Sequence, residues 1–245
     1  MSRLAVITGG SRGIGFATAR LLLELGHDVV ITGRTRESLD RACEELAGLG
    51  TISGLALDSA DAASTQRALE PLGADILVCN VGTGFSGTAQ STSLDEWEMV
   101  LRTNLTSAFA AMKAALPAML DRGWGRIVSV GSMASHQPIR YGAAYTASKH
   151  ALLGLTRAVA EDTRGTGVTA NLVAPAFVRT DMTVANAQRI AEARGSSLAE
   201  AEQQLGTMSN LGRLIEPEEV AEQIVALTTE DLTTTGTSVP MGFEL

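Results

Sequence analysis

Six short, nearly continuous apolar segments alternate with segments of helix length through the first 175 residues of this chain. A parallel strand that is covered by helices on both faces buries both of its sides, so it appears in a sequence as an unbroken apolar run. This order predicts an α/β fold, a doubly wound parallel sheet with right-handed crossovers. The expected strands are 4–8, 28–32, 51–57, 75–80, 126–131 and 168–174, and a final strand near 236–241 makes about seven.

The segments between these strands carry helix signals. Ser93 and Glu96 have the S-x-x-E spacing of a capping box, which marks the start of a long helical stretch ending at Arg122. No linker, repeat or low-complexity run interrupts the pattern, which favours one domain over residues 1–245. The other expected helices are 16–25, 36–49, 61–72, 145–164 and one that begins at Pro217.

The strand–helix rhythm breaks between residues 183 and 210. This stretch is rich in alanine, glutamate and glutamine, Gly195 interrupts it, and Ser197 with Glu200 forms a second capping box. We interpret it as two short helices that form a lid over a site. A structural excursion without such a role is the alternative interpretation.

Composition argues against several classes of function. The formal net charge is −8 and no basic run occurs, which speaks against nucleic acid and anionic membrane surfaces as partners. No apolar stretch approaches the roughly 18 residues of a membrane span, and the first residues do not resemble a secretory signal. Cys43 and Cys79 are too few for a disulfide framework or a zinc site, so we expect a cytoplasmic protein without a metal.

A glycine-rich turn follows the first expected strand and opens the first expected helix. Its glycines let the backbone turn tightly and approach a ligand closely, and the free N–H groups of the helix N-terminus suit a phosphate. In this position, between a strand and a helix, the turn indicates a dinucleotide-binding site. The candidate binding residues of the turn are Gly9, Ser11, Arg12, Gly13, Ile14 and Gly15.

Two arginines indicate whether the bound dinucleotide is NAD or its 2′-phosphorylated form, NADP. Folds that bind NAD usually carry an acidic residue at the end of the second strand, and residues 31–36 contain none. Arg12 and Arg34 can instead offer paired donors to a 2′-phosphate, which favours NADP(H). Thr35 follows Arg34, and Asp58 ends the third strand, where a side chain that contacts adenine would fall.

Tyr145 and Lys149 lie four residues apart in an expected helix, and Lys113 is the only other lysine of the chain. Residues i and i+4 share one face of a helix. A nearby ammonium would lower the pKa of the phenol from about 10 toward a range useful for proton transfer. Because such a pair also occurs as ordinary helix surface, its interpretation depends on Ser132 and on the glycine turn.

The turn TGGSRGIG at 8–15, the set of Ser132, Tyr145 and Lys149, and the strand–helix rhythm together resemble the short-chain dehydrogenase/reductase family, including its β-ketoacyl reductase-like members. The resemblance covers essentially the whole chain. It implies a Rossmann-type fold with a cofactor half at about 1–125 and a catalytic and substrate half at about 126–245.

The resemblance also implies roles for individual residues. Tyr145 would act as the general acid or base while hydride moves between NADP(H) and a small carbonyl or alcohol substrate. Lys149 would bond the nicotinamide ribose, Ser132 would hold the substrate oxygen, and Asn104 would hold a water that links Lys149 to solvent. A homo-oligomer, a tetramer or a dimer built on the two long helices, is expected on the same ground. The further cofactor-binding residues implied are Asn80, Gly82, Pro175, Val178 and Thr180.

Alternative functions stay open at this point. The protein could be a 3-oxoacyl reductase that acts on carrier-protein or other thioesters, a catalytically silent NADP-binding regulator, or a methyltransferase with a similar sheet. The presence of all four implied catalytic residues, Asn104, Ser132, Tyr145 and Lys149, favours an enzyme over a regulator. The positions with which ketoacyl reductases are thought to grip an acidic carrier protein correspond to Gly123 and Thr166, although Arg122 and Arg164 lie nearby. We therefore expect a small or medium free ketone or alcohol as substrate.

Overall fold

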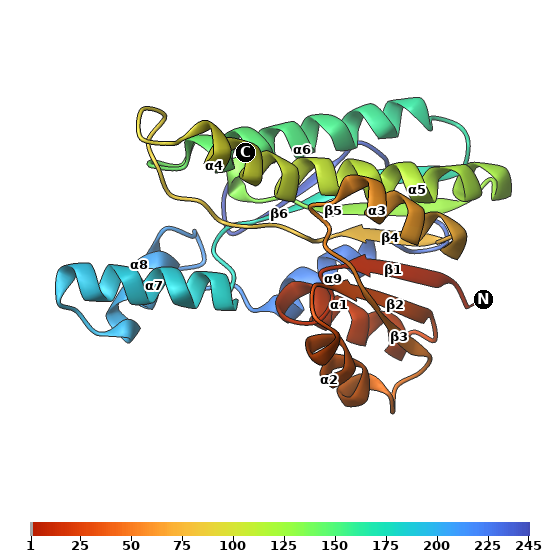
Figure 1. Cartoon of the computed structure of the whole chain (residues 1–245), viewed down its shortest axis with the longest axis horizontal. Helices are drawn as coiled ribbons and strands as arrows, with labels where there is room; N and C mark the ends of the chain where they lie inside the picture. The colour runs from red at the N-terminus through yellow and green to blue at the C-terminus, as the bar shows by residue number, and fades with distance from the viewer. Residues whose placement is uncertain (1) are drawn as a thin grey trace.

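The computed structural model describes residues 2–245, apart from the side chain of Ala193. Its described strands form one sheet of seven in the order β3-β2-β1-β4-β5-β6-β7 (Figure 1). All neighbouring strands are parallel, so the predicted doubly wound parallel sheet is confirmed. The strands are β1 (Leu4–Thr8), β2 (Asp28–Gly33), β3 (Ile52–Ala56), β4 (Ile76–Cys79), β5 (Gly125–Val130), β6 (Val168–Pro175) and β7 (Ser238–Met241).

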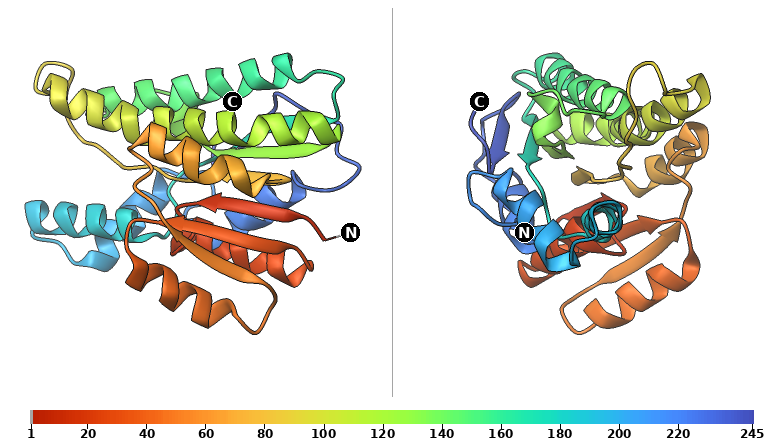
Figure 2. Two further views of the ribbon diagram at one scale, coloured as in Figure 1. Left: turned by 45° about the vertical axis from the view of Figure 1, so that its right-hand side comes forward. Right: turned by 90° about the vertical axis from the view of Figure 1, so that its left-hand side faces the viewer.

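Helices cover both faces of this sheet (Figures 1 and 2). The chain runs from β1 to β3 in one direction across the sheet and from β4 to β7 in the other. Because crossovers of parallel strands are as a rule right-handed, the helices between β1 and β3 cover the face opposite to the helices between β3 and β6. The first face carries α3 (Ala62–Leu69), α4 (Leu94–Leu101), α5 (Ser107–Arg122) and α6 (Ala143–Asp162), and the second carries α1 (Gly13–Glu24), α2 (Arg36–Leu46) and α9 (Pro217–Ala226).

Successive residues of the central strands pack into two different cores, one on each face. Val6 of β1 belongs to the core beneath α5 and α6, which includes Met112 and Leu152. Its neighbour Ile7 belongs to the core beneath α1, α2 and α9, which includes Leu22. Burial on both sides explains why the strands read as unbroken apolar runs in the sequence.

The long helical stretch predicted from Ser93 is not one regular helix. The capping box of Ser93 and Glu96 opens α4 as expected. A π-helical segment, Arg102–Thr106, then separates α4 from α5, and the N–H of Ser107 bonds the carbonyl five residues back. Such π-segments often occur at functional sites, and this one contains the predicted catalytic Asn104. Helix propensity did not predict this π-segment, because a shift of the backbone hydrogen bonds by one residue leaves no signal in the amino-acid composition.

The segment predicted at 183–210 forms a helical hairpin, α7 (Asp181–Arg194) and α8 (Leu198–Thr207). It begins two residues earlier than expected, because the turn after β6 already ends at Thr180. The hairpin has its own small core and lies beyond the carboxyl ends of the strands, away from the N-terminus (Figure 1). No helix within residues 2–245 is long and apolar enough to cross a membrane. These residues also contain no group of three or more histidine, cysteine or acidic side chains placed to hold a metal.

Candidate active site

The glycine turn forms a tight cradle between β1 and α1. Gly9 and Gly13 have φ of +68° and +55°, in the left-handed region that favours glycine. A Cβ on Gly15 would overlap the carbonyl oxygen of Gly9, so only glycine lets the helix start so close to the turn. Arg12 is the N-cap of α1 and makes no side-chain cap, which leaves the first N–H groups of the helix free for a ligand. The turn holds all six predicted residues, Gly9, Ser11, Arg12, Gly13, Ile14 and Gly15.

Asn80 ties this turn to the end of β4. Its side-chain amide donates to the carbonyl oxygens of Gly9 at 2.8 Å and Thr8 at 3.2 Å. The hydroxyl of Thr8 returns the contact by accepting the backbone N–H of Asn80 at 3.1 Å. Because β1 and β4 are neighbours in the sheet, two turns far apart in the sequence become one rigid unit. Asn80 therefore shapes the cradle from behind.

The two predicted phosphate-binding arginines differ in their surroundings. Arg34 follows β2, is exposed, and makes no hydrogen bond or ion pair with any residue from 2 to 245. Arg12 pairs with Asp181, the first residue of α7, at 2.8 Å, and both side chains are mostly exposed. Thr35, the N-cap of α2, accepts the N–H of Ser38. The sequence analysis missed Asp181, because nothing in the sequence places it beside a turn 169 residues away.

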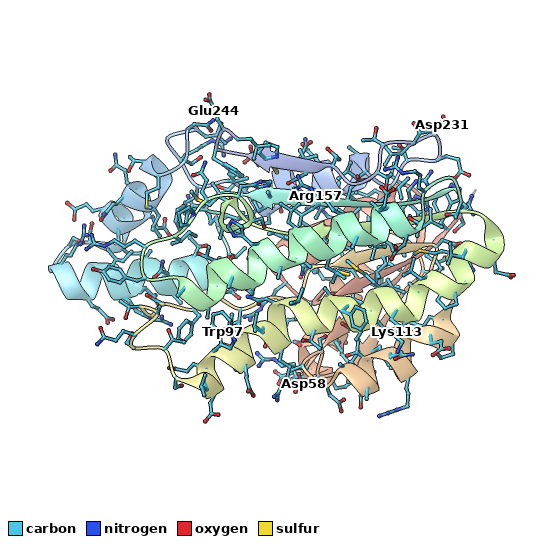
Figure 3. The ribbon with its side chains drawn as sticks, turned by 90° about the horizontal axis from the view of Figure 1, so that it is seen from above. Asp58, Trp97, Lys113, Arg157, Asp231 and Glu244 are labelled. Atoms are coloured by element: carbon cyan, nitrogen blue, oxygen red, sulfur yellow. The ribbon has the colours of Figure 1, made fainter. Side chains whose placement is uncertain are left out.

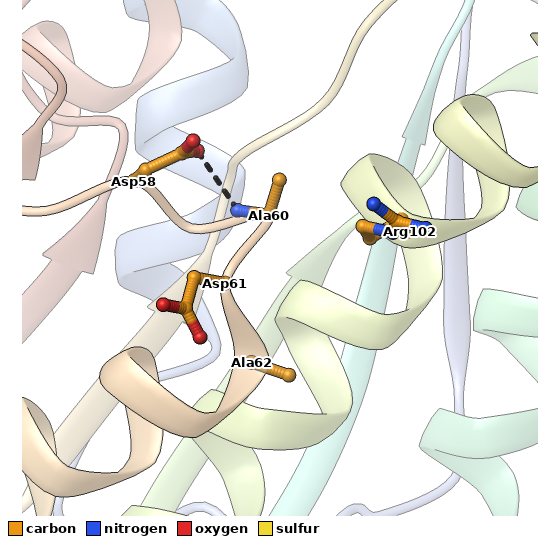
Figure 4. A pocket seen from close by; sticks show the side chains of 5 residues that line it. All are labelled: Asp58, Ala60, Asp61, Ala62 and Arg102. Atoms are coloured by element: carbon orange, nitrogen blue, oxygen red, sulfur yellow. Dashed lines mark hydrogen bonds between the residues drawn. The ribbon is translucent and has the colours of Figure 1, made fainter.

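Asp58 lies at the rim of a cavity of about 400 Å³ between the loop after β3, the start of α3 and the π-segment (Figure 4). One carboxylate oxygen of Asp58 accepts the N–H of Ala60 at 3.0 Å, which fixes the loop after β3. Asp61 and, across the cavity, Arg102 complete its polar lining. Asp58, the residue predicted to contact adenine, is thus one of the polar groups that line this cavity.

Tyr145 and Lys149 lie in the first turns of α6, on one face as predicted. The ammonium nitrogen of Lys149 is 5.9 Å from the centre of the Tyr145 ring and donates to the carbonyl of Val130, at the end of β5, at 2.9 Å. A Cβ on Gly82 would lie 3.4 Å from the same nitrogen, so Gly82 leaves room for it. The lysine is thus held between α6, the end of β5 and the turn after β4.

Ser132 follows β5 and faces the same region. It is the N-cap of a short 3-10 turn, Met133–Ser135, and its hydroxyl accepts the N–H of Ala134 at 3.2 Å. It also lies close enough to Tyr145 for its hydroxyl to affect the pKa of the phenol. This capping contact uses an acceptor site of Ser132 and leaves its proton available for a substrate oxygen.

The pKa of Tyr145 is shifted in the direction opposite to the one that its spacing from Lys149 led us to expect. Burial raises the pKa of the Tyr145 phenol, and the hydroxyl of Ser132 opposes that rise. Burial also lowers the pKa of Lys149 from 10.5 to about 8. A poorly solvated site penalises phenolate and ammonium alike, and here the ammonium is directed at Val130 instead of the phenol. Tyr145 is consequently held in its proton-bearing form.

Asn104 is fully buried in the π-segment. Its carbonyl oxygen accepts the N–H of Thr83 at 2.7 Å, and its amide donates to the carbonyl of Thr83 and to the hydroxyl of Ser148, both at 3.0 Å. Ser148 in turn donates to the carbonyl of Tyr145. Both amide hydrogens are thus engaged with the protein, so this side chain positions the loop after β4 and the start of α6. Its water-holding role stays a prediction.

The segment 175–180 leads from β6 to the glycine turn. Pro175 ends β6, and Val178 is buried and bridged to Ile215. A Cβ on Gly13 would lie 3.4 Å from the methyl carbon of Thr180, so this threonine borders the cradle. The predicted site residues therefore gather at the carboxyl edge of the sheet, from the segments that follow β1 to β6 and from α6.

Comparison with known proteins defines the class. The family model described as short chain dehydrogenase matches residues 3–191. Together with the parallel sheet and the Ser132, Tyr145 and Lys149 set, this match shows that the chain belongs to the short-chain dehydrogenase/reductase family, a family of oxidoreductases. The resemblance inferred from the sequence motifs is confirmed.

Individual relatives and a solved structure show which oxidoreductases of the family this chain is similar to. The chain is 35% identical to a 3-oxoacyl-(acyl-carrier-protein) reductase of Vibrio harveyi over 92% of this chain and 89% of the relative. It is 33% identical to a D-beta-hydroxybutyrate dehydrogenase of Rhizobium meliloti over 74% of each. Among solved structures, a variant of the actinorhodin polyketide ketoreductase with NADPH superimposes with a TM-score of 0.93 at 30% identity, covering 98% of this chain and 96% of that one.

The burial of Lys149 predicts a pH-dependent contribution to stability. Its folded pKa lies below the unfolded one, so between about pH 8 and 10.5 the unfolded chain keeps a proton that the folded protein releases, and stability rises with pH. Relative to Lys149→Met, the wild type should gain about 2 kcal/mol in unfolding free energy from about pH 7 to 9.5. Urea unfolding of both proteins at the two pH values measures this, and a flat difference would contradict the assignment.

Proposed function

We propose that this protein is an NADP(H)-dependent oxidoreductase that interconverts a ketone or aldehyde and the corresponding alcohol. The observation that carries the proposal is the meeting of the acid–base pair on α6 with a phosphate cradle at one edge of the sheet. Cofactor-bound relatives of the same fold, such as the actinorhodin ketoreductase with NADPH, support it. When bound, the nicotinamide of NADP(H) supplies or accepts the hydride.

The residues of the cradle fit a dinucleotide phosphate ester. The turn at 9–15 presents backbone N–H groups in a space that a side chain at Gly15 would close. Arg12 and Arg34 would hold a 2′-phosphate through paired N–H donors, and the Arg34 side chain makes no hydrogen bond or ion pair within residues 2–245. Asp58 would face the adenine end from its cavity, and Thr180, beside Gly13, would face the nicotinamide end. This arrangement favours NADP(H) over NAD(H).

The acid–base step would belong to Tyr145. In the reducing direction its phenolic proton passes to the carbonyl oxygen as hydride reaches the carbonyl carbon, and the O–H bond of Tyr145 breaks as the alcohol O–H forms. Ser132 would donate a hydrogen bond to the same oxygen and orient it. The ammonium of Lys149 would stabilise the phenolate left behind, since charge on Tyr145 strengthens its attraction to the lysine. In the oxidising direction the phenolate would take the alcohol proton.

We also propose that the α7–α8 hairpin is the substrate lid. It lies over the carboxyl edge, has its own core, and touches the cradle through the pair of Arg12 and Asp181. A free ketone of small or medium size remains the substrate that we expect. A 3-oxoacyl thioester is the second candidate, favoured by the named activity of the Vibrio harveyi relative. A cytoplasmic location remains a prediction from the composition.

Cofactor preference can be tested at Arg34. Arg34→Gln should raise the dissociation constant of NADPH about 10- to 100-fold, because a charge-assisted contact to phosphate contributes about 1.5–3 kcal/mol. Binding of NADH should change less than about twofold. Arg36→Gln is the matched control, since Arg36 donates to the carbonyl of Gly54. Fluorescence titration measures both cofactors, and equal losses for NADPH and NADH would refute the phosphate role.

Asp181 offers a second test of the same phosphate site. Its carboxylate occupies the guanidinium of Arg12 that a 2′-phosphate would use. Asp181→Asn should therefore tighten NADPH binding by a few fold, about the strength of an exposed ion pair, and leave NADH unchanged. Tighter binding of both cofactors would contradict a competition for Arg12.

The role of Tyr145 is tested by Tyr145→Phe. Removal of the phenolic proton should lower kcat about 10²- to 10⁴-fold for any ketone that the wild type reduces, the usual contribution of a positioned general acid. The dissociation constant of NADPH should stay within about threefold, because the ring remains. Decay of NADPH absorbance with a panel of ketones and aldehydes measures turnover. Undiminished kcat would rule out the mechanism, and nucleotide binding without any turnover by the wild type would favour the regulator.

We also propose that the protein is a homo-oligomer assembled through α5 and α6. These helices run along the upper face of the molecule, where Figure 3 labels Lys113 and Arg157. Phe109 and Leu120 of α5 are 51% and 44% exposed on that face, which a partner subunit would cover. Phe109→Glu should therefore shift the molar mass from light scattering toward the monomer of 25.5 kDa. A wild type that is already monomeric would refute the assembly.

A further inference from the structure

A second cavity, of about 290 Å³, opens beside the N-terminus of α6. One wall is the loop at 87–89, which follows β4, and the other is the segment 139–143, which leads into α6. Ala143 lines the cavity, and Tyr145 follows it by two residues on the first turn of the helix. The cavity therefore opens at the end of α6 that carries Tyr145, and none of the predicted cofactor-binding residues lines it.

The two walls are joined by backbone contacts. The N–H of Gly87 donates to the carbonyl of Tyr141 at 2.6 Å, and Gly87 and Gly142 form a parallel bridge. Tyr141 has a φ of +60°, the only positive φ of a non-glycine residue within 2–245. For a bulky aromatic residue this conformation is strained, and it persists only where surrounding contacts hold it. The bridge to Gly87 is such a contact, so the shape of this wall is held in place.

Arg140 lies on this wall and has no carboxylate partner. Its guanidinium lies over the ring of Tyr141, 4.7 Å from the ring centre, and its side chain is exposed. No hydrogen bond or ion pair joins it to any residue from 2 to 245, although the chain carries 27 acidic residues and Arg12 and Arg122 do pair with aspartates. Stacking on the ring orients the guanidinium plane and leaves its N–H edge free for an anion.

We infer that this cavity binds an anionic group of the substrate, and that Arg140 is the specificity-determining residue that receives it. The inference rests on the proposed function and names its substrate class: a carbonyl compound whose carboxylate or phosphate lies away from the reacting carbonyl. Tyr145 would donate its proton to the carbonyl oxygen. The guanidinium of Arg140, five residues earlier in the chain, would bind the anion through paired N–H donors. Because the protein as a whole is negatively charged, an anionic substrate is attracted at this local cation and not by the rest of the surface.

The experiment uses two matched substrate pairs with NADPH. Acetoacetate and ethyl acetoacetate differ in a carboxylate, and the acetoacetyl thioesters of 4′-phosphopantetheine and of pantetheine differ in a phosphate. Arg140→Gln should raise KM about tenfold for the anionic member of at least one pair, and the neutral members should change less than about twofold. The pair that responds identifies the anion as carboxylate or phosphate. Increasing salt should raise the same KM in the wild type.

Two further variants control for folding and for general charge effects. Arg140→Lys keeps the charge and should retain most of the preference for the anion. Arg41→Gln removes an arginine that pairs with Glu37 on the outer side of α2 and should leave every KM unchanged. Equal losses for anionic and neutral members, or no loss for either anion, would overturn the inference. A wild type that reduces the neutral ketones but neither anionic one would overturn it as well.

Failure of the proposed function would look different. If the wild type reduced none of the four compounds, calorimetric titration with acetoacetate and with 4′-phosphopantetheine would still measure the anion site directly. Binding to the wild type that Arg140→Gln weakens about tenfold would support the site in a protein of other function. Binding that is absent, or that does not depend on Arg140, would overturn the inference.

Discussion

Parallel strand pairing brings every strand of this protein to its carboxyl end on the same edge of the sheet, and the site depends on that constraint. The glycine turn follows β1, Asn80 follows β4, Ser132 follows β5 and Thr180 follows β6. These residues are separated by up to about 170 positions in the chain, yet one edge collects them because the strands are neighbours in the order β1-β4-β5-β6. The contacts between Thr8 and Asn80 then lock the first two turns together.

Burial controls the chemistry of the Tyr145–Lys149 pair more than proximity does. Both groups lie where water is scarce, so their neutral forms are favoured, and the ammonium is directed at a backbone carbonyl. In the mechanism that we propose, a proton-bearing phenol and a lysine whose pKa burial lowers to about 8 would suit a site that gives up a proton and regains it close to neutral pH. The strength of their attraction grows only when the phenol ionises, which links it to the proton transfer itself.

Membership of the family leaves the substrate open, and two segments outside the sheet border the site. The α7–α8 hairpin has a core of its own and reaches the glycine turn through one exposed ion pair, so it is linked to the cradle by a weak contact. The segment 139–143, which leads into α6, is held by Gly87 and carries the exposed guanidinium of Arg140.

Much of this architecture followed from local sequence patterns, and the exceptions have a common cause. Unbroken apolar runs predicted the strands, capping boxes predicted the starts of α4 and α8, and the glycine spacing predicted the cradle. The π-segment around Asn104, the pair of Arg12 and Asp181, and the carbonyl of Val130 beside Lys149 were not predicted. Each depends on which distant segments come to lie side by side.

The sequence by itself determined the parallel fold, the glycine turn and the placing of Tyr145 and Lys149 on one helix face, because periodicity, glycine spacing and an i, i+4 face are local properties of the chain. Only the tertiary structure decided the direction in which the pKa of each of these two groups is shifted, the partner of Arg12 and the exposed position of Arg140 over the ring of Tyr141. Solvent exclusion and ion pairing arise between segments far apart in sequence, so no local pattern carries them.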